Sequence, residues 1–431
     1  MALPVETVRV GLLGFGTVGQ SVARILCDGH VPRVSLVSIF NRRIASKRAD
    51  WVPASVVWTE NVDDVLGSDV DVIVELVGGL HPAYEWVRAA LLSGKSVVTA
   101  NKQLIAHYGA VLTELARARG QQLRFEASVA GGIPVLRALQ EGLAGDRLVE
   151  VRGVLNGTCA YILSRMQTAE LPFADALKEA QAAGFAEADP TEDVDGADAA
   201  AKLAIIAAVG LRRPVRVGDI AKQSIRPIDF VDFQYAREIG CTIRQIARAS
   251  VQDDGGVFAV VGPALVPLNS SFGRVDGGQN VVTVRGVFGG ETSFSGSGAG
   301  GNPTAVAVVS DLLSIHRPLG AGNGSAKGAG RVDAEAPAAA PHEVSNDFVA
   351  PHYIRFTVAD RPGILADIFP VFAKHGINVD AVVQLPRYRK DRLPFVATLE
   401  ACSSSVLNHA LAEIGGLDFH VEPPLALPIL R

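Results

Sequence analysis

One glycine-rich turn near the N-terminus constrains the fold more than any other stretch of the chain. An apolar run at residues 8–13 (VRVGLL) has the character of a buried strand, and an amphipathic run that predicts a helix begins shortly after it. The residues that join the two are Gly14, Phe15, Gly16, Thr17, Val18 and Gly19. A G-x-G-x-x-G pattern between a strand and a helix is the context that a dinucleotide-binding fingerprint requires. Its glycines permit a tight turn and close approach of the backbone to a pyrophosphate, so the sequence predicts a dinucleotide-binding fold.

The second predicted strand bears on the choice of cofactor. It covers residues 34–40 (VSLVSIF), and a site for NAD usually has an acid at its end to bind the ribose hydroxyls. The chain instead has Asn41, Arg42 and Arg43 there. Because guanidinium groups can hold a 2′-phosphate, the pattern favours NADP(H) over NAD(H), with Arg42 as a cofactor contact. The alternative is a solvated turn with ordinary surface arginines.

Further strand-like runs complete a sheet within residues 1–130. One covers 69–79 and ends in two glycines, and another covers 95–102 and ends at Lys102. Ligands of such sheets bind at the carboxyl ends of the strands, which predicts a place near the nicotinamide for Lys102. A surface lysine after a strand is the alternative. The last run carries Glu126 and leads into a Gly-Gly turn.

A stretch rich in acidic residues lies at residues 180–202. Its ionisable residues are Glu187, Asp189, Glu192, Asp193, Asp195, Asp198 and Lys202. A calcium loop would need acids at its first and twelfth positions, where Thr191 and Lys202 stand. A solvated acidic helix start with a surface ion pair is the simplest alternative. Because the apolar run LAIIAAV follows directly, we expect a largely buried helix with Lys202 at the edge of the interior, one turn from Asp198, as a candidate proton donor or acceptor.

A second domain is expected over residues 131–299. Asn156, Gly157 and Thr158 stand between a predicted strand and a helix, where they either orient a small polar substrate or cap the helix. Alternating segments from 216 to 295 predict antiparallel strands in an open sheet covered by helices.

A second glycine loop and an apolar helix follow at residues 294–315 (FSGSGAGGNPTAVAVVSDLLSI). We expect the loop to close over the cofactor, and the helix to return to the first domain and complete it over about 300–316. The alternative is a flexible connector, which the buried character of the helix disfavours.

Composition limits the remaining classes of function. The net charge is −5, and no basic run suggests nucleic acid as a partner. No apolar run reaches the roughly 18 residues of a membrane-spanning helix, and the start of the chain lacks a signal-peptide layout. The four cysteines are scattered without metal-ligand spacing, which fits free thiols and a cytoplasmic location.

The C-terminal part divides into a linker and a small module. Residues 317–349 are rich in Gly, Ala, Pro and Ser, which indicates a flexible linker without a core. Residues 350–431 predict the element order β-α-β-β-α-β, with an Asp-Arg-Pro-Gly turn before the first helix.

Six segments, taken together, resemble homoserine dehydrogenases over roughly residues 8 to 315. They are GLLGFGTVGQ, VVTANKQLIA, SVAGGIPVL, RGVLNGTCAYIL, AAGFAEADPTEDVDGADAAAK and SGAGGNPTA, in the order of the family. The resemblance implies an α/β chain with an N-terminal Rossmann domain and an α+β domain for substrate binding and dimerisation. It implies the reversible NAD(P)H-dependent reduction of L-aspartate 4-semialdehyde to L-homoserine, in threonine, methionine and isoleucine biosynthesis. Cys159 and Ser297 depart from the usual Asn and Pro of the family, and neither change removes a charge.

The resemblance also implies roles for single residues. Lys202 matches the proton donor and acceptor, Lys102 a second lysine near nicotinamide and substrate, and Asp198 an acid that orients Lys202. Glu187 and Asp193 match substrate-binding acids, with Asn156 and Thr158 as further candidates from their own pattern. Gly184 and Gly301 match cofactor contacts. A sodium site matches Glu126, Val129, Gly131 and Ile133, a carboxylate with main-chain carbonyls that suits a hard cation.

The C-terminal module resembles an ACT domain, a small amino-acid-sensing domain with a ferredoxin-like fold. The match rests on Asp360, Pro362, Gly363, Leu365, Gly376, Ile377 and Asn378. Because such modules pair side by side, it implies a homodimer or homotetramer, and threonine is the effector that it suggests. A packing domain without a ligand is the alternative for the module. For the whole chain, the competing functions are a non-catalytic amino-acid sensor and a dehydrogenase of another amino-acid aldehyde.

Overall fold

The computed structural model describes residues 7–31, 33–315, 341–386 and 388–430. The chain divides into two compact units, and each is built from three separate stretches. The first unit comprises Met1–Val149, Ala201–Val217 and Arg285–His342, and the second comprises Glu150–Ala200, Gly218–Val284 and Glu343–Arg431. Within the part of the chain that is described, no helix is long and apolar enough to cross a membrane.

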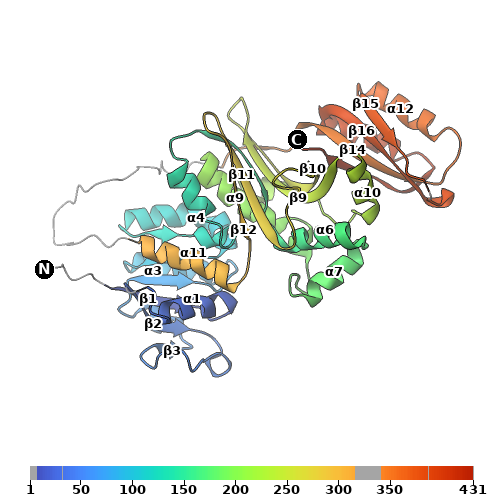
Figure 1. Ribbon diagram of the computed structural model, residues 1–431. Coiled ribbons are helices and arrows are strands. Elements are labelled where there is room, and N and C mark those ends of the chain that lie inside the picture. The colour runs from blue at the N-terminus through green and yellow to red at the C-terminus, as the bar shows by residue number, and fades with distance from the viewer. Residues whose placement is uncertain (1–6, 32, 316–340, 387, 431) are drawn as a thin grey trace. The chain divides into compact units, whose positions relative to one another are not determined.

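The first unit contains a six-stranded parallel sheet in the order β3-β2-β1-β4-β5-β6, drawn in blue and cyan in Figure 1. Its strands are β1 (Val8–Leu13), β2 (Val34–Phe40), β3 (Val57–Thr59), β4 (Val72–Glu75), β5 (Ser96–Thr99) and β6 (Leu123–Arg124). Helices α1 (Thr17–Cys27) and α11 (Gly301–Ser314) pack on one face, and α2 (Val62–Leu66), α3 (Ala83–Leu92) and α4 (Lys102–Ala118) on the other. Because helices cover both faces, the central strands are nearly continuous apolar runs. This strand order confirms the predicted dinucleotide-binding fold, whose ligands bind beyond the carboxyl ends of β1 and β4.

Shorter elements complete the first unit. They are η1 (Ile44–Ser46), η2 (Glu126–Ser128), α5 (Val135–Arg137), η3 (Ala138–Gly142), η4 (Ala207–Leu211) and β12 (Gly290–Ser297). The short helix η5 (Val217–Asp219) begins at the last residue of the stretch Ala201–Val217 and continues into the second unit. Helix α9 (Ala197–Ile206) runs from the acidic stretch into residues 203–207, which are all buried, as the apolar run predicted.

The second unit contains an open sheet with strands in the order β11-β7-β9-β10-β13, and β8 beside β10. These strands are β7 (Leu148–Val154), β8 (Ala221–Lys222), β9 (Cys241–Val251), β10 (Val257–Pro267), β11 (Gln279–Gly286) and β13 (Val344–Ser345). The long pair β9–β10 is antiparallel, with Cys241 opposite Pro267 and Val251 opposite Val257. The helices of this part are α6 (Gly157–Ala169), α7 (Phe173–Ala182), α8 (Thr191–Val194) and α10 (Phe230–Glu238).

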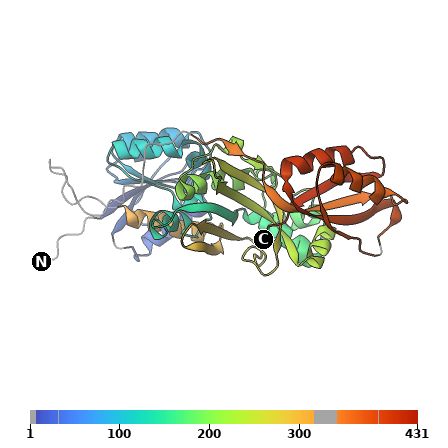
Figure 2. The same ribbon diagram turned by 90° about the horizontal axis from the view of Figure 1, so that it is seen from above.

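The C-terminal module belongs to the second unit and has the predicted order β-α-β-β-α-β. Its elements are β14 (Val349–Val358), α12 (Ile364–Lys374), β15 (Val379–Val383), η6 (Lys390–Arg392), β16 (Leu393–Ser403), α13 (Ser404–Ile414) and β17 (His420–Pro428). The antiparallel sheet runs β15-β16-β14-β17, and both red helices lie on the same face of it (Figure 2). From the other face, Tyr353, Leu425 and Leu427 join a buried cluster with Phe233 and Tyr235 of α10.

The predicted linker, residues 317–349, lies outside the described residues up to position 340. Its remaining part contains β13, which pairs in parallel with β10, and the first residue of β14.

Candidate active site

The glycine turn between β1 and α1 has a geometry that only glycine allows at two positions. Gly14 has a φ of 100°, and a Cβ atom there would lie 2.9 Å from the carbonyl oxygen of Leu76. A Cβ atom at Gly19 would lie 2.2 Å from the carbonyl oxygen of Gly14. At Gly16, by contrast, an added Cβ atom would meet nothing within 4 Å, and no side chain caps the start of α1. The turn thus leaves open space in front of helical amides, which fits a pyrophosphate.

The other predicted cofactor residues lie in this turn or next to it. Phe15 is buried and packs edge-on against Trp58, while Thr17 and Val18 form the first turn of α1. A Cβ atom at Gly301 would lie 2.8 Å from Ser21 Oγ, so the start of α11 packs closely on α1. Arg42 is exposed just beyond the end of β2, where a group bound at the carboxyl edge of the sheet would extend.

A buried network that the sequence analysis missed orders the residues before Lys102. Glu75 ends β4 with no exposed surface, and its carboxylate accepts hydrogen bonds from the amides of Val77 (2.8 Å) and Gly78 (3.1 Å) and from Thr99 Oγ1 (2.6 Å). Asn101 caps α4 and donates to the carbonyl of Gly79 at 2.7 Å. The sequence signal that could have revealed this network was Glu75, an acid at the end of an apolar strand.

Two further bonds fix the place of Lys102. The amide of Asn101 donates to Thr99 Oγ1 at 3.0 Å, and Asn101 Oδ1 accepts from the amide of Leu104 at 3.1 Å. Lys102 is therefore the first residue of a capped helix at the carboxyl edge of the sheet, and its side chain is half-buried.

In the second unit, Asn156 brings two of the predicted acids together. Its side-chain nitrogen donates to Asp193 Oδ1 at 2.6 Å and to Asp198 Oδ2 at 2.9 Å. Its side-chain oxygen accepts from the amide of Cys159 at 2.8 Å and so caps α6. Asn156 therefore does cap its helix, and the same side chain also links the two carboxylates.

Thr158 and the stretch before the acids have structural contacts of their own. Thr158 Oγ1 donates to the carbonyl of Phe185 at 2.6 Å, and the Phe185 ring stacks on Tyr161 with 4.3 Å between centroids. Gly184 is exposed with a φ of 77° after the end of α7, and Glu187 is also exposed. The Thr158 hydroxyl thus holds the loop that carries Gly184 and Glu187.

Helix α9 carries the candidate proton donor. Asp198 is buried, with 4% of its surface exposed, and Lys202 is half-buried one turn further on. The predicted spacing is confirmed, and the helix is apolar beyond the lysine. A carboxylate linked to Asn156 and a lysine on the same helix face can together bind a polar group and move a proton.

The predicted cation ligands lie in a strained turn next to a buried carboxylate. Glu126 accepts hydrogen bonds from the amides of Leu136 (2.8 Å) and Arg137 (2.7 Å), and its burial raises its pKa to about 7. Ala130 and Gly131 have φ values of 53° and 57°, and such backbone strain is typical of functional turns.

The main-chain carbonyl oxygens of that turn also bear on whether a cation can bind there. Among the described residues, no amide donates to the carbonyls of Val129 or Gly131, whereas the carbonyl of Ile133 accepts from Val135. A buried carboxylate with carbonyl oxygens suits a hard cation, so the residues fit the predicted sodium site. No group of three or more His, Cys, Asp or Glu side chains that could bind a metal occurs in the described part of the chain.

The doubly wound sheet with its glycine turn, together with a lysine one turn from a buried acid, defines an NAD(P)-dependent oxidoreductase. Comparison with known sequences narrows this class. Residues 134–313 match the family described as homoserine dehydrogenase, residues 14–126 match its NAD binding domain, and residues 352–418 match the ACT domain. The chain belongs to the homoserine dehydrogenase family.

Individual relatives support the same assignment. A homoserine dehydrogenase of Bacillus subtilis is 38% identical over 421 residues, which span 94% of this chain and 95% of the relative. The crystal structure of a homoserine dehydrogenase from Thiobacillus denitrificans gives a TM-score of 0.88 at 34% identity, covering 99% of this chain and 98% of that one. A hyperthermophilic archaeal homoserine dehydrogenase in complex with NADPH gives 0.61 at 26% identity, covering 72% and 97%.

Proposed function

We propose that this enzyme interconverts L-homoserine and L-aspartate 4-semialdehyde, with Lys202 as the group that moves the proton. A nicotinamide bound by the glycine turn would supply a hydride to the aldehyde carbon, or accept one from the alcohol carbon. Lys202 donates a proton from Nζ to the aldehyde oxygen as the new C–H bond forms, and it takes the proton back in the reverse direction. Lys102, at the carboxyl edge of the sheet, assists near the nicotinamide.

The observation that carries this proposal is the double hydrogen bond from Asn156 to Asp193 and Asp198. An ammonium group needs carboxylate oxygens, and the amide holds two carboxylates together at the start of α9. In this arrangement Asp193 and Glu187 bind the amino group of the substrate, while Asp198 orients Lys202. Thr158 contributes by holding the loop with Glu187 and the cofactor contact Gly184.

For the cofactor, we propose a preference for NADP(H). Arg42 is exposed just beyond β2, and the residues that follow this strand directly, Asn41–Arg43, include no acid to bind ribose hydroxyls. The archaeal relative was solved with NADPH, which agrees with this choice. In this proposal residues 14–19 and Gly301 form the cradle for the pyrophosphate, and α11 completes the cofactor domain of residues 1–130. A sodium ion bound by Glu126, Val129, Gly131 and Ile133 would fix the turn that follows this domain.

For the C-terminal module, we propose that threonine binds at the start of α12 and inhibits the enzyme as an end product of the pathway. A cavity of about 420 Å³ lies there, lined among others by Asp360, Arg361 and Gly363. The two charges suit the ammonium and carboxylate of an amino acid. Pairing of these modules implies a homodimer or homotetramer.

The test of the proton-transfer role is Lys202→Ala in the full chain. We expect turnover to fall by at least about a hundredfold, because general acid–base groups contribute that much, while the cofactor dissociation constant stays unchanged. Lys178→Ala is the matched control, since that lysine is exposed and, among the residues that the structure describes, pairs only with Asp175. Near-normal turnover of Lys202→Ala, measured by nicotinamide absorbance with homoserine, would remove Lys202 from the mechanism.

A further inference from the structure

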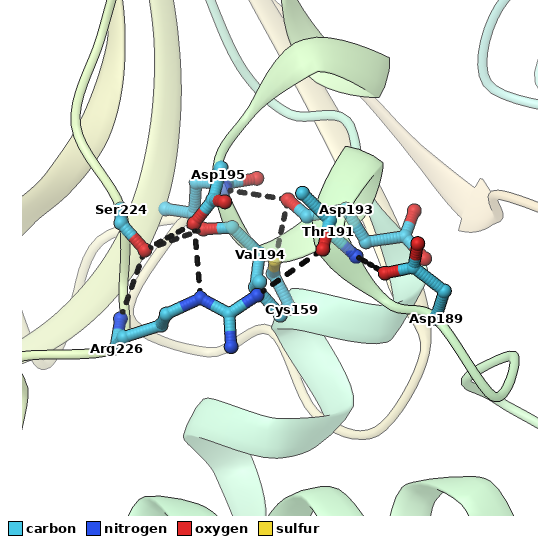
Figure 3. Close-up of polar contacts among 9 residues, drawn as sticks. Cys159, Asp189, Thr191, Asp193, Val194, Asp195, Ser224 and Arg226 are labelled. Carbon is cyan, nitrogen blue, oxygen red and sulfur yellow. Dashed lines mark hydrogen bonds and ion pairs between the residues drawn. The ribbon is translucent and has the colours of Figure 1, made fainter.

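Residues 224–226, which follow β8, hold the short helix α8 and Asp195 just after it (Figure 3). Ser224 Oγ donates to Asp195 Oδ1 at 2.6 Å, and Arg226 Nε donates to the same oxygen at 3.2 Å. Arg226 Nη2 also lies 3.5 Å from Thr191 Oγ1, and the amide of Ile225 donates to the carbonyl of Val194 at 3.1 Å. Both ends of α8 are therefore tied to residues 224–226.

The short helix held in this way carries Asp193, whose carboxylate accepts from Asn156. The Asp193 carbonyl accepts from Cys159 Sγ at 3.2 Å and from Gln245 Nε2 at 3.3 Å. Asp195 follows two residues later, so a shift of the Asp195 carboxylate changes the position from which Asp193 reaches Asn156.

The same segment continues directly into contacts with the C-terminal module. The carbonyl of Pro227 accepts from Arg355 Nη2 at 3.2 Å. Asp232, which is fully buried, accepts hydrogen bonds from Arg355 Nη1 and from the Tyr353 hydroxyl, the latter at 2.8 Å. Tyr235 donates to the carbonyl of Pro394 at 2.7 Å.

The contacts with α8 and the contacts with the C-terminal module are joined by buried apolar side chains as well as by the backbone. Ile225 and Ile228 are buried in the same cluster as Tyr353 and Leu427 of the module. Since packed interiors do not deform continuously, a change in β14 is passed to residues 224–228 rather than absorbed between them.

We propose that residues 224–235, the coupling segment, transmit the state of the C-terminal module to the substrate-binding acids. Ser224 and Arg226 act as positioning residues for Asp193, and Asp232 connects them to β14 through Tyr353 and Arg355. The regulatory half of this proposal rests on the proposed inhibition by threonine. The positioning half does not.

The first test measures steady-state kinetics of the full-length enzyme with Arg226→Ala. We expect the KM for homoserine to rise about fivefold, the size expected for a half-exposed charge pair, while the KM for the cofactor stays the same. Arg226→Lys should restore part of the loss. Arg237→Ala is the matched control, because the side chain of this exposed arginine of α10 makes no hydrogen bond or ion pair with the described residues. An unchanged homoserine KM, or an equal rise for both substrates, overturns the positioning role.

A double-mutant cycle tests the connection itself. Tyr353→Phe keeps the ring and removes the hydroxyl that bonds Asp232, and we expect it to raise the homoserine KM by about twofold. Residues far apart usually have additive effects, whereas joined residues do not. We therefore expect the double variant Arg226→Ala/Tyr353→Phe to resemble Arg226→Ala alone. The connection is overturned if the double variant raises the homoserine KM by the product of the two single effects. It is also overturned if Tyr353→Phe leaves both the homoserine KM and the thermal midpoint at their wild-type values.

Threonine titration separates this inference from the proposed regulation. If calorimetry shows that the wild type binds threonine and kinetics show inhibition, Tyr353→Phe should keep the binding and lose most of the inhibition. Full inhibition in that variant overturns the coupling. Absence of threonine binding to the wild type ends the proposed regulation and the regulatory half of the inference, whereas the positioning half is decided by the kinetics of Arg226→Ala and its control alone.

Discussion

Asn156 and Asp198 are joined by a buried hydrogen bond of 2.9 Å, and the same amide nitrogen also bonds Asp193. Two carboxylates that lie close together repel each other, and two N–H groups directed at them reduce that cost without adding charge. The link therefore fixes Asp193, for which we propose binding of the substrate's amino group, and Asp198, for which we propose the orientation of Lys202.

Asn156→Ala removes both the helix cap and the link between the acids. We expect a loss of about 1 kcal/mol in the free energy of unfolding, as for other N-cap residues. We also expect kcat/KM for homoserine to fall by about tenfold or more, because hydrogen bonds to charged groups contribute about 1.5–3 kcal/mol. Asn61→Ala, which removes the cap of α2, is the control. The proposal fails if both variants show the same small loss of activity.

Replacement by alanine should affect different properties at two glycines of the fingerprint. Gly16→Ala has room for its methyl group, so we expect a normal thermal midpoint and a raised KM for the cofactor. Gly19→Ala places its methyl group 2.2 Å from a carbonyl oxygen, so we expect a lower thermal midpoint. Calorimetry and cofactor titration of both variants measure this contrast. A Gly16→Ala enzyme with unchanged cofactor affinity would place the pyrophosphate elsewhere.

Arg42→Ala should separate the two nicotinamide cofactors. Because the guanidinium would bind a 2′-phosphate only, we expect the KM for NADP(H) to rise by about tenfold and the KM for NAD(H) to stay constant. Arg48→Ala, another exposed arginine nearby, serves as the control. Equal changes for both cofactors would contradict the assignment.

The buried Glu126 predicts a pH dependence that a cation should modify. Burial raises its pKa to about 7, against the opposing effect of the amides of Arg137 and Leu136. The folded protein then keeps a proton that the unfolded chain loses at lower pH, so stability is present below about pH 4.5 and is lost as pH rises through about 7. A sodium ion should offset this loss. We expect sodium chloride to raise the thermal midpoint relative to choline chloride above pH 7, and to have no effect near about pH 5.

Glu126→Gln is the variant that checks this expectation, because it removes the titrating group. The difference between the two salts should disappear at every pH. Burial also raises the pKa of Asp311 to about 6, so part of the decline at lower pH should remain. A sodium effect that survives in Glu126→Gln would rule out this site.

The ion pair between Arg355 and Asp232 should dominate the attachment of the C-terminal module. Both side chains are almost fully buried, so Arg355→Ala leaves an unpaired charge in the interior. We expect a loss of about 3–5 kcal/mol in the free energy of unfolding by urea. Arg389→Ala, which breaks an exposed pair with Asp391, should cost about 0–1 kcal/mol. Similar losses in the two variants would contradict the structural role of Asp232.

Local patterns were enough to predict much of the fold and part of the site. The glycine turn, the cap at Asn156 and the spacing of Asp198 and Lys202 all depend on residues that are neighbours in the chain. The link from Asn156 to the two acids was not predicted, since it depends on how α6 packs beside α8. Glu75 and Arg226 were missed for the same reason, because their partners lie far along the sequence.

The shared cluster also changes how the C-terminal module should be tested. Deleting residues 350–431 would be the direct way to remove the proposed inhibition by threonine. Tyr353 and Leu427, however, complete a core together with Phe233 and Tyr235. Deletion would expose those apolar side chains to water and destabilise the remaining unit, so single substitutions are the better experiment.

That core has a further consequence for the order of events during synthesis. Leu425, Leu427 and Ile429 pack with side chains of α6 and α10, which leave the ribosome far earlier. The second unit cannot close until residues 425–429 have left the ribosome. Translation products that stop before these residues should therefore carry an incomplete core, and we expect the cell to degrade them.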